Sequence, residues 1–159
     1  MYVVTGATGN TGSVVAHRLL NQGKEVRVIG RSADRLQQLA ARGAEPYVAD
    51  ITDQADLARV FAGAEAVYAM LPPHISSQDV PAEQQHMIEA IAGALEQAKV
   101  RHAVSLSSIG ADKDSGTGPV VWLHAFEDRL NRVAGLNVLH LRCGYFMENT
   151  LSQAGTIAA

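Results

Sequence analysis

The chain has 159 residues and a formal net charge of −3, and its residues are 47% hydrophobic and 18% charged. This composition is typical of one globular domain, and scattered rather than clustered basic residues argue against nucleic acid as a direct partner. No apolar run approaches the roughly 18 residues that cross a bilayer, so no membrane partner is expected. Cys143 is the only cysteine, which excludes an internal disulfide and fits a cytoplasmic location. None of the six histidines has another histidine or a cysteine at a metal-ligand spacing, so we expect no metal site.

The first predicted strand, which begins at Tyr2, leads directly into a glycine-rich turn. Glycines stand at positions 6, 9 and 12, and an apolar-periodic segment follows at once. A strand, a glycine turn and a helix in this order place backbone N–H groups around a phosphate. We expect the helix to end at Gly23 and to bury Val14, Val15, Leu19 and Leu20.

Strand and helix signals alternate along the rest of the chain. Further strands are expected over residues 26–30, 46–49, 66–71, 103–107 and 136–141. Helices are expected after a Ser32 cap, after a Thr52 or Asp53 cap, from Pro81 onward, and over 121–133, with loops at 72–80 and 108–119. The side chains expected to be buried on these helices include Leu36, Leu39, Leu57, Val60, Phe61, Met87, Ile88, Ile91 and Leu95.

This alternation predicts an α/β fold with a doubly wound parallel sheet, strand order 3-2-1-4-5-6 and helices on both faces. The ligand crevice then lies at the carboxyl ends of the first and fourth strands, where the strand order reverses. Residues 1–150 are expected to form a dinucleotide-binding domain, followed by a tail over 151–159.

The G-x-x-G-x-x-G spacing gives each glycine its own expected role. Gly6 makes the tight turn, Gly9 lets the backbone approach a pyrophosphate, and Gly12 allows close packing of helix on strand. A turn without a ligand is the alternative. No G-K-[ST] follows the glycines, which excludes a P-loop. The residues expected at the pyrophosphate are Gly6, Thr8, Gly9, Asn10, Thr11 and Gly12.

The end of the second strand bears on the choice of cofactor. An acidic residue there usually binds the ribose 2′-hydroxyl of NAD, whereas arginine accommodates the 2′-phosphate of NADP. Here Gly30 is followed by Arg31 and Ser32, with Arg35 one turn further on. Arg31 offers a charged planar fork for a phosphate, so we expect NADP(H) rather than NAD(H). The alternative is that Arg31 is a surface charge and Ser32 only a helix cap.

Asp50 and Ile51 follow the third strand and are expected at the edge and face of the adenine. In the alternative interpretation Asp50 only starts a turn.

Several segments together resemble one known family. They are T-G-A-T-G-N-T-G at 5–12, G-R-S at 30–32, A-D at 49–50, M-L-P-P at 70–73, S-L-S-S-I-G-A-D at 105–112 and L-R-C-G-Y-F-M-E-N at 141–149. The chain is similar, over nearly its whole length, to the NmrA-like group of atypical short-chain dehydrogenases/reductases. The resemblance implies an NAD(P)(H)-binding Rossmann domain. Some members reduce quinones, imines or other small electrophiles, and others bind the dinucleotide without turnover as redox-sensing regulators.

The chain departs from this family in its catalytic helix. Active short-chain dehydrogenases commonly carry Tyr-x-x-x-Lys there, and the tyrosine donates a proton. Residues 120–128 contain neither residue. By its distance from Gly135, His124 corresponds to the position at which relatives carry Lys or His, and an imidazole titrates near neutral pH. The alternative is a helix-surface histidine paired with Asp128.

Other site residues follow from the resemblance. Ser107 resembles the family serine that orients the substrate carbonyl and lies near the cofactor; otherwise its hydroxyl only satisfies the strand end. Met70, Leu71 and Pro72 are expected to flank the adenosine and ribose. Tyr145, Phe146 and Met147 either line the nicotinamide pocket, with Tyr145 near the cofactor, or cap the hydrophobic edge beside the sixth strand, which we favour.

The resemblance also bears on the end of the chain and on function. Relatives continue past the segment 141–149 into a substrate-binding lobe, so this chain is either a fragment or leaves substrate selectivity to its loops and a partner subunit. We expect NADPH-dependent hydride transfer to a small electrophile such as a quinone. The main alternative is a non-catalytic redox sensor, and a distant one is a sugar-nucleotide epimerase-like enzyme. The expected partner is a small molecule, with formation of a homo-oligomer left open.

Overall fold

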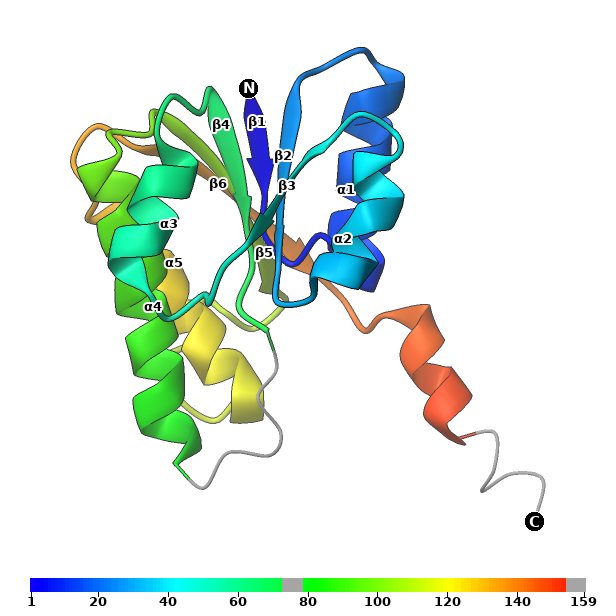
Figure 1. The fold of residues 1–159 in the computed structure, drawn as a ribbon. Coiled ribbons are helices and arrows are strands. Elements are labelled where there is room, and N and C mark those ends of the chain that lie inside the picture. Colours follow the sequence, from blue (N-terminus) through cyan, green and yellow to red (C-terminus); the bar gives the residue numbers. More distant parts are fainter. Residues whose placement is uncertain (73–78, 154–159) are drawn as a thin grey trace.

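The computed structural model describes residues 1–72 and 79–153 of the chain. Within this part, six strands form one sheet in the order β3-β2-β1-β4-β5-β6, and every neighbouring pair is parallel (Figure 1). The predicted doubly wound Rossmann topology is therefore confirmed, including the reversal of strand order beside β1. The strands are β1 (Tyr2–Val4), β2 (Val26–Gly30), β3 (Glu45–Val48), β4 (Ala66–Ala69), β5 (His102–Ser108) and β6 (Asn137–Cys143).

Helices cover both faces of the sheet, as predicted. Figure 1 shows α1 (Asn10–Asn21) and α2 (Ala33–Ala40) on one face. The other face carries α3 (Gln54–Phe61), α4 (Val80–Gln97) and α5 (Val121–Asn131). Helices lie on both faces because each strand–helix–strand crossover is right-handed and the strands are added outward from β1 in two directions.

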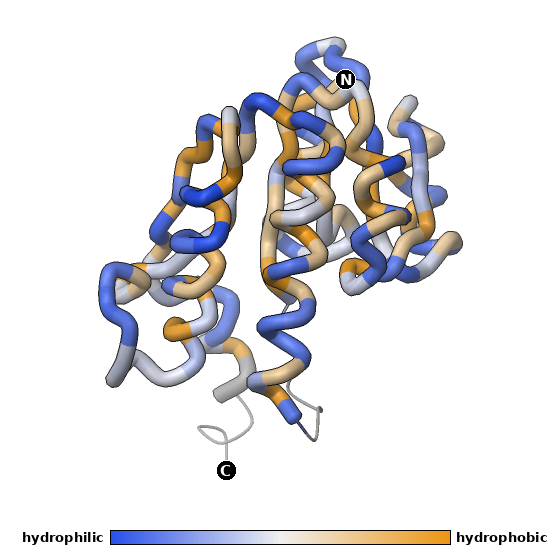
Figure 2. The backbone as a smooth tube through the Cα atoms, turned by 90° about the vertical axis from the view of Figure 1, so that its left-hand side faces the viewer, coloured by the Kyte–Doolittle hydropathy of each residue, from blue (hydrophilic) through white to orange (hydrophobic). Residues whose placement is uncertain are grey.

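Each face of the sheet has its own hydrophobic core in the described part of the chain. On the α1 and α2 side, Val4, Val28 and Leu36 are fully buried. On the other side, Phe61, Ile91 and Phe126 belong to a larger cluster beneath α3, α4 and α5. Figure 2 views this second side and shows hydrophobic and hydrophilic residues alternating along the helices, as expected for helices with one buried face.

Side-chain caps determine where three of these helices begin. Ser32 Oγ accepts a hydrogen bond from the Arg35 N–H at 3.5 Å, and Asp79 Oδ1 accepts one from Ala82 at 3.1 Å. Asp53 Oδ1 accepts one from Asp56 at 2.9 Å, so Asp53 rather than Thr52 caps α3. Each acceptor satisfies an N–H of the first turn that has no partner within its own helix.

The predicted buried face of α1 is wrong at Val14, which is 56% exposed. The helix instead buries Gly12 and Ala16, four residues apart on one side. Val14 lies two residues after Gly12, which is about 200° around the helix. Since α1 packs its Gly12 side onto the glycine turn, Val14 faces outward.

Several boundaries also differ from the prediction. β4 ends at Ala69 rather than Leu71, and β5 and β6 extend to Ser108 and Cys143. A short 3₁₀ helix, η1 (Gly118–Val120), ends the predicted loop 108–119, and a second, η2 (Met147–Gln153), follows β6. In Figure 1, η2, drawn in orange to red, extends away from the body of the domain. Its range includes residue 150, where the dinucleotide-binding domain was predicted to end.

Residues 73–78 of the predicted loop 72–80 and residues 154–159 of the predicted tail lie outside the described residues. Among the helices described, none combines the length and apolar character of a membrane span.

Candidate cofactor and substrate site

Three glycines shape the turn between β1 and α1. Gly6 has φ +59°, and a Cβ there would lie 2.5 Å from Sδ of Met70. The Gly9 N–H donates to the Gly6 carbonyl oxygen at 2.9 Å. A Cβ at Gly12 would lie 2.3 Å from that same oxygen. These contacts fit the expected roles of Gly6 in the tight turn and Gly12 in close packing of α1.

The N-terminus of α1 differs from those of the capped helices. Its N-cap is Gly9, which has no side chain to accept a hydrogen bond, and its first turn contains no acidic residue. The first N–H groups of a helix lack intrahelical partners, and the helix dipole favours negative charge beside them. This end of α1 is therefore suited to a phosphate group.

A cavity of about 460 Å³ opens at this helix end, and we call it the glycine-turn cavity. The glycine turn and the carboxyl ends of β1, β2, β3 and β4 contribute to its wall, which is where the topology predicted the crevice. Its lining includes ten of the predicted cofactor residues: Gly6, Thr8, Gly9, Asn10, Thr11, Arg31, Arg35, Ile51, Met70 and Pro72.

Arg31 and Arg35 give one end of this cavity its positive charge. Both are exposed, and neither guanidinium forms an ion pair with another residue in the described ranges. No acidic side chain from the end of β2 competes for them, since the first carboxylate after the strand is Asp34, on the first turn of α2. The uncapped α1 terminus suits the pyrophosphate, which both cofactors share, and the two arginines fit the 2′-phosphate of NADP better than the ribose diol of NAD.

Three predicted cofactor residues line neither the glycine-turn cavity nor the larger cavity that adjoins it. Gly12 supports the turn from behind, and Ser32 caps α2. Asp50 Oδ1 accepts hydrogen bonds from the N–H and the hydroxyl of Thr52, at 2.9 and 2.8 Å. This contact supports the alternative in which Asp50 starts a turn, whereas Ile51 lines the cavity.

A second cavity, of about 900 Å³, adjoins the first, and we call it the apolar cavity. No charged side chain of the described residues lines it. The predicted residues Met70, Leu71, Pro72, Ser107 and Tyr145 are in its wall. Phe146 lines both cavities, whereas Met147 lines neither and is 81% exposed. The Tyr145 side is open, since that residue is 70% exposed.

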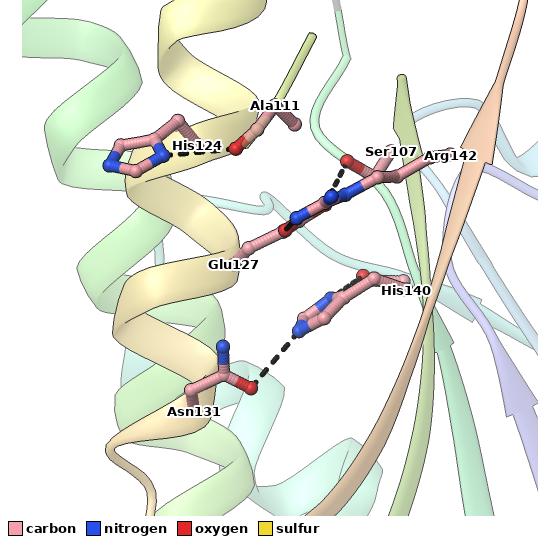
Figure 3. Close-up of polar contacts among 8 residues, drawn as sticks. Ser107, Ala111, His124, Glu127, Asn131, His140 and Arg142 are labelled. Carbon is pink, nitrogen blue, oxygen red and sulfur yellow. Dashed lines mark hydrogen bonds and ion pairs between the residues drawn. The ribbon is translucent and has the colours of Figure 1, made fainter. Parts of the chain in front are cut away.

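The Ser107 side chain forms a hydrogen-bonded cluster with Glu127 and Arg142 behind the wall of the apolar cavity (Figure 3). Its Oγ donates to Oε1 of Glu127 on α5 at 2.5 Å. The Arg142 guanidinium on β6 binds the same carboxylate in a bidentate manner. Its Nε donates to Oε1 at 3.0 Å, and its Nη2 donates to Oε2 at 2.6 Å. The register Ser107↔Arg142 between β5 and β6 brings these side chains together under α5.

Electrostatics keep the Glu127 carboxylate ionised. Burial by itself raises the pKa of Glu127, but the hydrogen bonds from Arg142 and Ser107 and the nearby positive charge outweigh burial and lower the pKa overall. In return, the hydrogen bond to Glu127 raises the pKa of Arg142. Glu127 is therefore an acceptor only, and the Ser107 hydroxyl is the donor in their contact.

His124, the other predicted catalytic residue, lies apart from Ser107. Its Nδ1 is 2.9 Å from the carbonyl oxygen of Ala111, and α5 contributes Trp122 and Leu123 rather than His124 to the apolar cavity. Figure 3 shows the His124 ring beside Ala111, away from Ser107, Glu127 and Arg142. Because a carbonyl oxygen can only accept, Nδ1 of His124 carries a hydrogen in this contact.

The alternative for His124 was a helix-surface histidine paired with Asp128, but the contact of its Nδ1 is with Ala111. Asp128 forms its ion pair with Arg132, one turn further along α5.

A second histidine belongs to the polar group around Ser107. Nδ1 of His140 lies 2.6 Å from Oγ of Ser105, and Nε2 lies 3.1 Å from Oδ1 of Asn131. A neutral ring satisfies both contacts by accepting at Nδ1 and donating at Nε2. Burial lowers the pKa of His140, partly opposed by Glu127.

Sequence reasoning missed Glu127, Arg142 and much of the apolar wall. Arg142 lies within the matched segment 141–149 but had no role assigned to it. Glu127 stands in a helix whose surface is rich in charge, and nothing in the spacing marks it as buried. Leu106, Trp122 and Leu123 resemble ordinary core residues in sequence, although all three line the cavity.

Comparison with known proteins agrees with this geometry. The model of a family described as NAD(P)H-binding matches residues 6–157. The chain is 30% identical over 158 residues to an NAD(P)H azoreductase of Xenophilus azovorans, a match that covers 99% of this chain and 52% of that protein. It is 31% identical over 154 residues to a (4-alkanoyl-5-oxo-2,5-dihydrofuran-3-yl)methyl phosphate reductase of Streptomyces griseus, covering 97% and 51%. The chain thus spans about half the length of the curated relatives it matches.

Solved structures extend the likeness. An NADPH-dependent quinone oxidoreductase of Escherichia coli, complexed with NADPH, has a TM-score of 0.81 at 27% identity, covering 98% of this chain and 53% of that one. The family match, the glycine turn and the strand order lead to one conclusion: the chain belongs to the NAD(P)H-binding family, of the NmrA-like atypical short-chain dehydrogenase/reductase class.

Proposed function

We propose that this domain binds NADPH across the two adjoining cavities and that the bound NADPH reduces a neutral, planar electrophile such as a quinone. The observation that carries the proposal is that the two cavities share part of their lining. Met70, Pro72, Leu106, Phe146 and Asn149 line both the glycine-turn cavity and the apolar cavity. A dinucleotide with its phosphates at α1 therefore has its other end beside an apolar chamber.

Different residues of the chain bind different parts of NADPH. The N–H groups at the start of α1, with Asn10 and Thr11, hold the pyrophosphate. Arg31 and Arg35 hold the 2′-phosphate, and Ile51 packs against the adenine. When bound, NADPH supplies the hydride, so the protein contributes position and exclusion of water.

The apolar cavity favours a particular class of acceptor. Its aromatic lining, Trp122, Tyr145 and Phe146, suits a planar ring, and the absence of charged lining among the described residues favours a neutral one. The names of the azoreductase and quinone oxidoreductase relatives support this class. A sugar nucleotide is disfavoured because the described residues of this wall offer no cation to its diphosphate.

Steady-state NADPH oxidation at 340 nm with 2-methyl-1,4-naphthoquinone tests the proposal. A matched pair of variants links turnover to the cavity. Ile109→Asp places a charge on the cavity wall, whereas Leu139→Asp places one on β6 outside it, and the two positions are 69% and 59% exposed. We expect Ile109→Asp alone to lower kcat/KM, with the affinity for NADPH unchanged in both.

The contrary outcome is tight NADPH binding with no oxidation by any acceptor in a panel of quinones and azo dyes. That result would favour the binding-only redox sensor.

A further inference from the structure

The hydroxyl of Ser107 stands at the boundary between the apolar cavity and the polar group behind it. Ser107 lines the cavity and is only 4% exposed. Its one hydrogen is directed away from the cavity, to Oε1 of Glu127 at 2.5 Å. Its oxygen accepts no hydrogen bond from any of the residues that the structure describes.

Glu127 holds that hydrogen firmly. The carboxylate accepts two further hydrogen bonds, both from Arg142, and its side chain is only 6% exposed. An ionised carboxylate is a stronger acceptor than a neutral carbonyl. A ligand carbonyl in the cavity would therefore have to compete with Glu127 for the Ser107 hydrogen.

We propose that Glu127, held by Arg142, is a positioning residue that fixes Ser107 as a hydrogen-bond acceptor toward the apolar cavity, so that this wall selects ligands carrying an O–H or N–H donor. A serine hydroxyl retains two lone pairs when it donates, and these remain for a ligand. Among quinones and related acceptors, those that carry a hydroxyl or amino substituent should bind more tightly than those with carbonyl oxygens alone. This role differs from polarisation of a substrate carbonyl, which the resemblance implied for Ser107. The inference rests on the proposed function only in taking the apolar cavity as the acceptor site.

The chain carries its own reporter for the test. Trp122 is the only tryptophan, and it lines the apolar cavity. Three probes of nearly equal shape differ in one group: 4-tert-butylphenol has a donor, 4-tert-butylanisole has that donor capped, and 4-tert-butylacetophenone has a carbonyl. Their Kd values are measured by Trp122 fluorescence with no NADPH present.

We expect wild type to bind the phenol roughly 2- to 10-fold more tightly than the anisole, the range of one neutral hydrogen bond. Ser107→Ala should reduce this ratio to about one while keeping both Arg142–Glu127 hydrogen bonds, and Ser107→Thr should restore it. The double variant E127M/R142M frees the Ser107 hydrogen, so it should raise the affinity for the ketone and narrow the difference between the ketone and the phenol. Replacing both partners avoids leaving one charge buried alone.

Preferential binding of the ketone by wild type would overturn the inference, as would a phenol-to-anisole ratio that Ser107→Ala leaves unchanged. If the double variant does not fold, Ser107→Ala and Ser107→Thr still decide the question. The probes bind without turnover, so this experiment is independent of quinone reduction. Donor selectivity with no quinone reduction would leave the inference standing and contradict the proposed function. Quinone reduction without donor selectivity would do the opposite.

Discussion

Glu127 on α5 and Arg142 on β6 form a two-pronged ion pair whose partners are very unequally buried. The Glu127 side chain is 6% exposed, whereas that of Arg142 is 43% exposed. The pair connects α5 to β6, an edge strand of the sheet, directly beside Ser107. An unpaired charge is costly only where water cannot reach it. Removing Glu127 and removing Arg142 should therefore lower the free energy of unfolding by different amounts.

Arg142→Met should destabilise the domain more than Glu127→Met. The first variant leaves a buried carboxylate without its cation, whereas the second leaves a guanidinium that water can solvate. We expect Glu127→Met to cost no more than about 1 kcal/mol, since methionine fills a similar volume with apolar atoms. Urea denaturation of the two variants gives the comparison, and equal losses would contradict it.

Gly12→Ala should destabilise the domain, and Gly9→Ala much less. The new Cβ at position 12 would lie 2.3 Å from the Gly6 oxygen, while that at position 9 would lie 3.3 Å from it. Both contacts are with backbone, which cannot rotate away, so α1 must shift in Gly12→Ala at a cost of roughly 1–3 kcal/mol.

Thermal and urea unfolding measure the stability of the two glycine variants. NADPH titration adds a second comparison, because a side chain at Gly9 would occupy the predicted approach to the pyrophosphate. Gly9→Ala should therefore lose affinity while retaining most of its stability.

Arg31→Ala and Arg35→Ala should each weaken NADPH binding and leave NADH binding unchanged. Both residues line the glycine-turn cavity, and a charge-assisted hydrogen bond of about 1.5–3 kcal/mol corresponds to a roughly 10- to 100-fold change in Kd. Arg18→Ala, at another exposed arginine outside the cavity, controls for the loss of one positive charge. Calorimetric titration with both cofactors is the measurement, and parallel losses for NADH would argue against a 2′-phosphate site.

Stability should fall as the pH drops below 6.5, and His140 should contribute to that fall. Burial lowers the pKa of His140 below its usual value of 6.5. Between the folded-state pKa and 6.5 the unfolded chain therefore binds more protons, so the free energy of unfolding decreases with falling pH in this window. Glu127, with a pKa lowered from 4.5, adds a further loss at more acid pH.

His140→Gln should flatten the dependence between pH 6.5 and the onset of the Glu127 loss. His102→Gln, at an exposed histidine that begins β5, should retain it. Urea denaturation series at several pH values compare the three proteins. A wild-type slope that survives in His140→Gln would assign the effect to another group.

Local patterns were enough to predict much of the fold, because helix caps and turns act within a few residues. Ser32 and Asp53 each accept from an N–H three residues ahead, so their spacing alone predicts a helix start. The exposure of Val14 could not be predicted from local pattern. Its apolar character suited a buried face, but the close approach of Gly12 to Gly6 decided which side of α1 is covered.

By itself, the sequence determined the doubly wound sheet and the glycine turn between β1 and α1, because alternation of elements and the chirality of crossovers leave few other topologies. The tertiary structure alone decided what Ser107 does. Its hydrogen goes to Glu127, 20 residues away, and Arg142 follows Glu127 by another 15. No local spacing encodes such a contact, since it requires the β5–β6 register and the packing of α5 over both strands.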